Sequence, residues 1–261
     1  MTQPTYTFTD GKAYERMMGR WSKIAGDQFL DWIDAPKGKS WIDVGCGNGA
    51  FTEVLIARTA PAAVTGVDPS DGQIAFARER PGAKLAQFRT ADAQALPFPD
   101  KSFDNATMAL VIVFLSDPLK AAQEMARVVR AGGIVTTYMW DYPEGFPLRP
   151  VGEAMKSLGL GPSAPPNVDA ARADSMRRYW TDAGLEAVET KEIRFRISYS
   201  SFDDFWESTA VPMGSVGTAI AKMSEETRER LKAKLREQLP MASDGSISYE
   251  AAANAVKGRV A

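Results

Sequence analysis

Residues 41–52 read Trp-Ile-Asp-Val-Gly-Cys-Gly-Asn-Gly-Ala-Phe-Thr, and this stretch decides the fold. Its first four residues are mostly apolar and are typical of a short buried strand, three glycines follow at alternate positions, and a helix is expected from about Phe51. Glycine permits a sharp turn and the close approach of a ligand. A helix N-terminus adds unpaired N–H groups and a partial positive charge. The stretch therefore predicts a cradle for the polar part of an adenosine-containing cofactor, at the switch point of a parallel sheet.

Two classes of cofactor fit this loop. Gly45-x-Gly47-x-x-Ala50 satisfies the dinucleotide fingerprint with alanine in the third place, which is typical of nicotinamide-dependent oxidoreductases. Gly45-x-Gly47-x-Gly49, with Asp43 two residues ahead, resembles motif I of the class I S-adenosylmethionine (SAM) methyltransferases. A plain connection between a strand and a helix would carry such glycines too, so the rest of the chain has to decide.

Composition narrows the chemistry that the chain can perform. Its 261 residues are 44% hydrophobic and 25% charged, as expected for one large α/β domain. The net charge of −2 gives no general affinity for nucleic acid or membranes. The chain has no histidine, which excludes the Ser-His-Asp triad, histidine zinc ligands and histidine bases, and no metal is predicted. Cys46 is the single cysteine and is expected to be a small buried turn residue.

Targeting signals are not evident in the sequence. The first 21 residues contain no apolar signal core, and no run of eighteen apolar residues occurs. We therefore expect a cytoplasmic protein that does not bind membranes.

Strands and helices are expected to alternate after the glycine loop. Apolar segments at 64–67, 85–90, 105–113 and 134–140 predict four further parallel strands. The first of them ends on Asp68, about twenty residues past the glycines, where a carboxylate can accept hydrogen bonds from the ribose diol of either cofactor. Ser70 is the expected N-cap of the following helix.

A second segment makes the resemblance specific. Residues 91–104 read Ala-Asp-Ala-Gln-Ala-Leu-Pro-Phe-Pro-Asp-Lys-Ser-Phe-Asp. This is similar to the Asp-Ala-x-x-Leu-Pro-Phe-x-Asp-x-x-Phe-Asp segment of class I methyltransferases of the methyltransferase domain 11 type, and nicotinamide dehydrogenases have no such element here. The Arg-x-Gly-Gly at 130–133 is also familiar from this family. The resemblance covers residues 41–140.

The resemblance implies SAM as the cofactor. It implies that Asp92 accepts a hydrogen bond from the adenine amino group, with the Ala93 backbone beside it. An N-terminal helix often closes over the cofactor in this family, so that Arg20 either grips the methionine carboxylate or lies on the surface beside core aromatics. The full set of implied cofactor-binding residues is Tyr14, Arg20, Asp43, Gly45, Cys46, Gly47, Asp68, Pro69, Gln73, Asp92, Ala93, Gln94, Ala109 and Leu110.

The chain departs from the family just after the fourth strand. The family usually has one or two histidines there, where this chain has Val-Phe-Leu at 113–115. No histidine can assist proton removal, and the sequence leaves the catalytic residues unknown. Asp141 and Tyr142 are the nearby side chains that could act if the acceptor needs deprotonation.

The C-terminal part is expected to complete a Rossmann-like, doubly wound, mostly parallel seven-stranded sheet with an antiparallel last strand and a helical insertion. Helices are expected at 151–160, 170–183 and 201–239, and a strand at 187–197. The final segment reads as the last strand or a short helix. The predicted organisation is an N-terminal helical cap (1–40), a SAM-binding core (41–197), a helical insertion or lid (198–245) and the last strand of the core (246–261).

These features favour a SAM-dependent methyltransferase that acts on a small molecule by in-line displacement. Aromatic faces can bind a sulfonium cation, and Trp140, Tyr142 and Trp206 are expected to line the acceptor, with core packing as the alternative role for each. A nicotinamide-dependent oxidoreductase and a non-catalytic SAM-binding protein are the alternatives. Nucleic acid is not expected as the acceptor, since no basic stripe or Asn-Pro-Pro-aromatic tetrad is present. The acceptor and the oligomeric state are left open.

Overall fold

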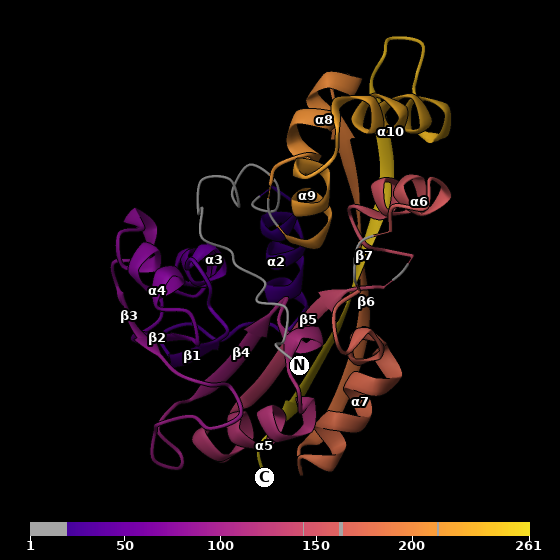
Figure 1. Cartoon of the computed structure of the whole chain (residues 1–261). Helices are drawn as coiled ribbons and strands as arrows, with labels where there is room; N and C mark the ends of the chain where they lie inside the picture. Colours follow the sequence, from indigo (N-terminus) through magenta and orange to yellow (C-terminus); the bar gives the residue numbers. More distant parts are fainter. Residues whose placement is uncertain (1–19, 143, 162–163, 213) are drawn as a thin grey trace. The chain divides into compact units, whose positions relative to one another are not determined.

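The computed structural model describes residues 20–142, 144–161, 164–212 and 214–261 (Figure 1). Within these residues, seven strands form a sheet in the order β3-β2-β1-β4-β5-β7-β6. The part of the predicted N-terminal helical cap before residue 20, which includes Tyr14, lies outside the described residues. No helix of the described part is long and apolar enough to cross a membrane.

Five parallel strands make up the half of the sheet that carries the glycine loop. β1 is central and pairs with β2 on one side and β4 on the other. Its last four residues and all seven of β5 are buried, because helices cover both faces. The chain moves outward from β1 to β3 and then returns to β4, so the loops after β1 and β4 meet at the switch point. The strands are β1 Ser40–Val44, β2 Ala63–Asp68, β3 Ala86–Thr90, β4 Asn105–Ala109 and β5 Ile134–Trp140.

The last two strands form the antiparallel edge that the sequence predicts. β7 (Ile247–Arg259) runs antiparallel to β5, and β6 (Glu186–Tyr199) lies beyond it. Lys257 pairs with Glu189 at 3.4 Å and Ser248 contacts Ser198 at 3.2 Å, so the numbering rises along β6 as it falls along β7. β6 is therefore parallel to β1–β5, and β7 is the antiparallel strand. The strand alternative for the final segment is confirmed.

Helix starts follow the capping residues in the sequence. The Ser70 hydroxyl accepts from the backbone N–H of Gln73, as predicted, and Asp117 accepts from the N–H of Lys120 at 2.9 Å. In the part of the chain that contains β1–β5, the helices are α2 Arg20–Trp32, α3 Ala50–Thr59, α4 Asp71–Arg78, α5 Pro118–Val128 and α7 Ala173–Asp182, with 3-10 turns η2 Pro81–Ala83, η3 Ile112–Phe114 and η4 Val168–Ala171.

The predicted fourth strand is too long. It ends at Ala109 rather than Val113, because Leu110 has a left-handed backbone with φ +62° and the chain then winds into η3. The predicted helical stretch 201–239 is three separate helices, α8 Phe202–Thr209, α9 Gly214–Ala221 and α10 Glu225–Gln238.

The chain divides into two compact units. One comprises residues 22–142, 165–193 and 253–261, and the other the described parts of 1–21, 143–164 and 194–252. In the second unit, α10 contacts α6 (Arg149–Ser157), and the guanidinium of Arg236 lies 4.0 Å from the ring centroid of Phe202 on α8. Such a cation–π contact lets a charged helix pack on an aromatic one. The predicted boundaries of the cap, the core and the insertion, at residues 40, 197 and 245, stay a prediction.

Trp180 fastens α7 to β5, which gives a test of the fold. Its buried indole Nε1 donates to the carbonyl of Val135 at 2.8 Å. In the variant Trp180→Phe this carbonyl loses its donor and a void is left, so we expect the free energy of unfolding in urea to fall by about 2–4 kcal/mol. The half-buried Trp32 is the matched control, and Trp32→Phe should cost about 1 kcal/mol or less. Equal losses in the two variants would contradict this account of α7 packing.

Candidate functional site

The loop after β1 is a tight turn built on glycine. Gly45, Gly47 and Gly49 have φ values of +74°, +52° and +79°, a backbone region that residues with a side chain rarely adopt. The backbone N–H groups of Gly45 and Cys46 donate to the carbonyl of Val67 at 2.7 and 2.9 Å. The loop therefore folds over the end of β2 before α3 begins.

The tip of this loop is open. A Cβ atom on Gly45 would lie 2.4 Å from Cγ2 of Val111, in the segment after β4, so this position is closed by protein. A Cβ atom on Gly47 would meet no atom of the described residues within 4 Å. Gly47 thus leaves room for a ligand to approach the backbone, as the glycine pattern predicts.

Asp68 joins the end of β2 to the tip of the glycine loop. Its Oδ2 accepts from the N–H of Gly47 at 3.0 Å, and its Oδ1 accepts from the N–H of Ser70 at 2.9 Å. Burial raises the pKa of this carboxyl above its usual value, and the two hydrogen bonds oppose that shift. Each carboxylate oxygen can accept a second hydrogen bond, so Asp68 retains capacity for a ligand hydroxyl.

Asp43 lies inside the protein beneath the loop. It is completely buried, and its Oδ2 accepts from the hydroxyl of Thr52 at 2.6 Å. Its Oδ1 has no partner among the described residues, and neither has the buried hydroxyl of Thr107 at the adjacent position of β4. Burial raises the pKa of Asp43 to about 7, the charge of Asp68 adds to the shift, and the Thr52 hydrogen bond opposes it.

Cys46 is a buried turn residue, as expected. Burial raises the pKa of its thiol well above the usual value, and the charges of Asp43 and Asp68 raise it further. A thiol with a raised pKa is a poor nucleophile, so Cys46 is not suited to covalent catalysis.

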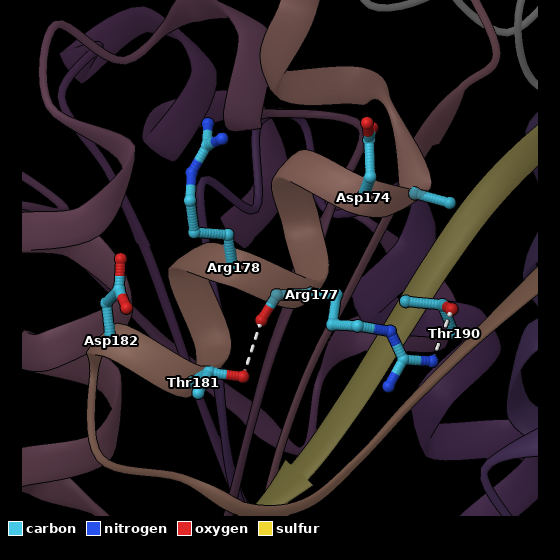
Figure 2. A pocket seen from close by; sticks show the side chains of 7 residues that line it. Asp174, Arg177, Arg178, Thr181, Asp182 and Thr190 are labelled. Carbon is cyan, nitrogen blue, oxygen red and sulfur yellow. Dashed lines mark hydrogen bonds between the residues drawn. The ribbon is translucent and has the colours of Figure 1, made fainter.

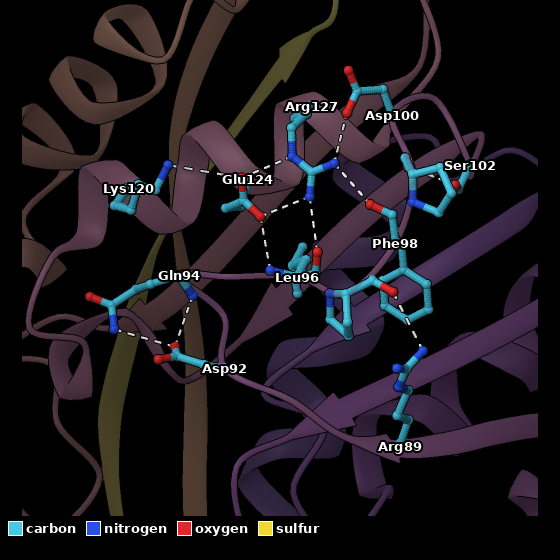
Figure 3. A network of polar contacts seen from close by, with 12 residues as sticks. Arg89, Asp92, Gln94, Leu96, Phe98, Asp100, Ser102, Lys120, Glu124 and Arg127 are labelled. Atoms are coloured by element: carbon cyan, nitrogen blue, oxygen red, sulfur yellow. Dashed lines mark hydrogen bonds and ion pairs between the residues drawn. The ribbon is translucent and has the colours of Figure 1, made fainter.

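Asp92 and Gln94 form a compact turn after β3 (Figure 3). Asp92 Oδ1 accepts from the backbone N–H of Gln94 at 2.9 Å and from its side-chain Nε2 at 3.3 Å. Asp92 Oδ2 accepts no hydrogen bond from a described residue, and the side chain is exposed. Ala93 between them is buried. Asp92 therefore presents one free carboxylate oxygen in a fixed orientation.

An ion pair on α5, between Glu124 and Arg127, holds the segment that follows the turn at Asp92 and Gln94. The sequence analysis did not predict this pair. Arg127 donates to the carbonyls of Leu96 and Phe98 at 2.9 and 2.8 Å, while Glu124 accepts from the N–H of Leu96 at 2.8 Å (Figure 3). The hydrogen bond from Arg127 lowers the pKa of Glu124. The sequence offered only a glutamate three residues before an arginine, a spacing that indicates an ion pair within one helix and says nothing of backbone partners elsewhere.

Other predicted cofactor residues lie in varied surroundings. Leu110 has the strained φ noted above and donates its N–H to the carbonyl of Tyr138 at 2.9 Å, directly after Ala109. Pro69 is exposed, and Gln73 is buried on α4. The Arg20 side chain lies outside the described part of the structure.

The predicted acceptor residues are divided between the two compact units. Trp140, at the end of β5, is buried with 1% of its surface exposed, and Tyr142 is half-buried. Trp206 belongs to the other compact unit, where the ammonium of Lys232 lies 5.2 Å from its ring centroid. Asp141 accepts from the side-chain amide of Asn254 at 2.8 Å. The acceptor-binding role of these residues stays a prediction.

A separate surface pocket of about 510 Å³ lies on α7 and β6 (Figure 2). Arg177 lines it and donates to the carbonyl of Val188 at 2.8 Å and to the hydroxyl of Thr190 at 3.0 Å. In the order of the sheet, β4, β5 and β7 separate β6 from β1, so this pocket is distinct from the glycine loop.

Comparison with known proteins settles the family. The model of the family described as "Methyltransferase domain" matches residues 42–137. An O-methyltransferase of Penicillium expansum, cnsE, is 31% identical over 220 residues, which is 80% of this chain and 76% of the relative. The chain belongs to the class I SAM-dependent methyltransferases. A demethylmenaquinone methyltransferase of Renibacterium salmoninarum is also similar to this methyltransferase, with 29% identity over 69% of the chain and 74% of the relative.

Solved structures show the same fold. The YcgJ protein of Bacillus subtilis is 21% identical, with a TM-score of 0.58 over 90% of the methyltransferase and 97% of that chain. The [4+2]-cyclase SpnF is also 21% identical, with a TM-score of 0.56 over 97% of the methyltransferase and 85% of the cyclase. The cofactor of the methyltransferase is SAM, and the glycine loop fits it, since Gly47 leaves open space beside the carboxylate of Asp68.

The buried carboxyl of Asp43 predicts a pH-dependent stability. Its pKa in the folded protein, about 7, lies above the unfolded value of 3.8, so the folded state holds the proton more tightly and stability falls as the pH rises from about 4 to 7. Asp43→Asn cannot ionise and removes this loss. Relative to the wild type, the variant should gain up to about 4 kcal/mol of unfolding free energy over that interval. Urea titrations at pH 4 and 7 measure it.

The control for this test is Asp34→Asn, at an exposed position. Its unfolding free energy should follow the wild type at both pH values. If the difference in unfolding free energy between Asp43→Asn and the wild type is the same at pH 4 and pH 7, Asp43 does not titrate in this interval.

Proposed function

We propose that this methyltransferase transfers the methyl group of SAM to a small-molecule acceptor by in-line displacement. The observation that carries the proposal is the hydrogen bond between Asp68 and Gly47 at the open tip of the glycine loop. It sets a carboxylate that can accept from a ribose diol beside backbone that a ligand can approach closely.

The order of the strands supports an assignment of the candidate residues to successive groups along SAM. The sheet runs β3-β2-β1, and the candidate residues at or just after the ends of these strands are Asp92, Asp68 and Gly47 in turn. We assign Asp92 to the adenine amino group, Asp68 to the ribose hydroxyls and the glycine loop to the methionine part. The backbone N–H of Ala91 donates to the carbonyl of Asp68 at 3.1 Å, which fixes the first two positions relative to each other.

Catalysis in this proposal depends on positioning. The bound cofactor supplies a methyl group on a positively charged sulfur, and the protein aligns the acceptor and excludes water. Such alignment can contribute on the order of 7–11 kcal/mol at best. Because the chain has no histidine, proton loss from the acceptor falls to Asp141, Tyr142 or solvent.

A small acceptor is supported by the relatives and by charge. Relatives of this chain are named as O-methyltransferases and as demethylmenaquinone methyltransferases. The net charge of −2 is unlike that of proteins that bind nucleic acid. A phenol or hydroquinone is therefore the acceptor class that we propose to try first.

The role of Asp68 predicts the effect of its removal. Asp68→Ala should weaken the binding of S-adenosylhomocysteine, the demethylated product, by about 1–3 kcal/mol, because hydrogen bonds to a charged group are lost. Calorimetric titration measures this change. Asp182→Ala is the control, since Asp182 is an exposed residue at the C-terminal end of α7. Unchanged affinity in Asp68→Ala would remove Asp68 from the cofactor site.

Methyl transfer is tested with SAM carrying a labelled methyl group and a panel of phenols, hydroquinones, amines and thiols. We expect label in a phenolic product with the wild type, and less with Asp68→Ala at limiting SAM. Label in protein or RNA alone would overturn the small-molecule acceptor. Cofactor binding without transfer to any class would favour a non-catalytic SAM-binding protein.

A further inference from the structure

Gln94 connects two loops at the carboxyl edge of the sheet. The nitrogen of its side-chain amide bonds within the turn after β3, where Nε2 donates to Asp92 Oδ1 at 3.3 Å. The oxygen of the same amide bonds to the segment after β4, where Oε1 accepts from the hydroxyl of Ser116 and from the backbone N–H of Asp117, both at 2.8 Å. A single amide group thus makes hydrogen bonds to both loops.

The contact with Asp92 decides which carboxylate oxygen is free. Oδ1 is occupied by the backbone and side-chain N–H groups of Gln94, whereas Oδ2 accepts from no described residue. Asp92 is exposed, so its side chain would otherwise rotate among several orientations. Holding one orientation in advance lowers the entropy that a ligand has to overcome on binding.

The contact with Ser116 and Asp117 reaches the segment beside the glycine loop. Asp117 caps α5, and residues 110–115 precede it. The same segment also accepts hydrogen bonds from Asn167, whose backbone N–H donates to the carbonyl of Val113 at 3.1 Å and whose side-chain amide donates to the carbonyl of Leu115. Val111 in this segment closes the space at Gly45.

We propose that Gln94 is a positioning residue that aims Asp92 at the adenine amino group and, through the same amide, restrains residues 110–117. The inference rests on the proposed role of Asp92 in adenine binding. Its consequence is that occupation of the adenine position stabilises the segment that borders the glycine loop.

Gln94→Glu separates the two functions of the side chain. A carboxylate at this position can still accept from Ser116 and Asp117, but it has no N–H for Asp92 and repels its charge. Gln94→Ala loses both contacts. Gln87→Glu is the matched control, because Gln87 is exposed on β3 and the same charge is introduced.

The first experiment compares S-adenosylhomocysteine with S-inosylhomocysteine, in which an oxygen replaces the adenine amino group. In the wild type and in Gln87→Glu, the amino compound should bind at least about tenfold more tightly, as expected for a hydrogen bond to a charged group. In Gln94→Glu the ratio should fall below about threefold. An unchanged ratio in Gln94→Glu would overturn the proposal for Gln94. A ratio of one in the wild type would overturn the adenine contact of Asp92 itself.

Hydrogen exchange tests the second contact, and it has a different readout. S-adenosylhomocysteine at saturation should slow exchange in residues 110–117 of the wild type and of Gln87→Glu, but not of Gln94→Glu or Gln94→Ala, since both variants lose the side-chain contact with Asp92. Slowing of the same size in Gln94→Ala would show that the segment responds to the cofactor without Gln94, and the coupling would be wrong. A cooperative urea transition in each variant confirms that it is folded.

Discussion

The hydrogen bond from the Gly47 N–H to Asp68 is the interaction on which the site depends. It joins the turn after β1 to the end of β2, and it exists because three glycines take backbone angles that bring an N–H group across the strand end. The parallel pairing of β1 with β2 sets both partners at the same edge of the sheet. The pairing of the strands therefore determines where the ligand-binding edge lies, and the backbone sets the position of its side chains.

The charges around this loop explain why the same glycine pattern suits one cofactor class. The carboxylate of Asp68 at the tip of the loop raises the free energy of negative charge nearby, as its effect on the pKa of Asp43 and of Cys46 shows. A pyrophosphate would add further negative charge at this point, whereas the sulfonium and amino groups of SAM are positive. The local charge thus favours SAM, in agreement with the family comparison.

Sequence patterns predicted what depends on local chemistry. The bounds of β5 agree with the structure, because an apolar run follows Gly-Gly, and the cap Ser70 has the expected role. The predicted end of β4, at residue 113, was wrong, because residues 110–113 are as apolar as the residues of a buried strand. Their turn is imposed by the Leu110 bond to Tyr138 and the contact of Val111 with Gly45. Glu124 and Arg127 were missed because their partners are backbone groups about thirty residues away, which no side-chain pattern reveals.

The position of β7 has a consequence for biosynthesis. β7 lies between β5 and β6, yet it is the last of the seven strands to leave the ribosome. Until residues 247–259 emerge, a nascent chain can pair β1–β5 but leaves the buried strand β5 as an open edge, and β6 has no neighbour to join. Unpaired edges of this kind are prone to pair with other chains. Completion of this sheet is therefore a late, long-range step, and chaperones that cover the edge of β5 would act before it.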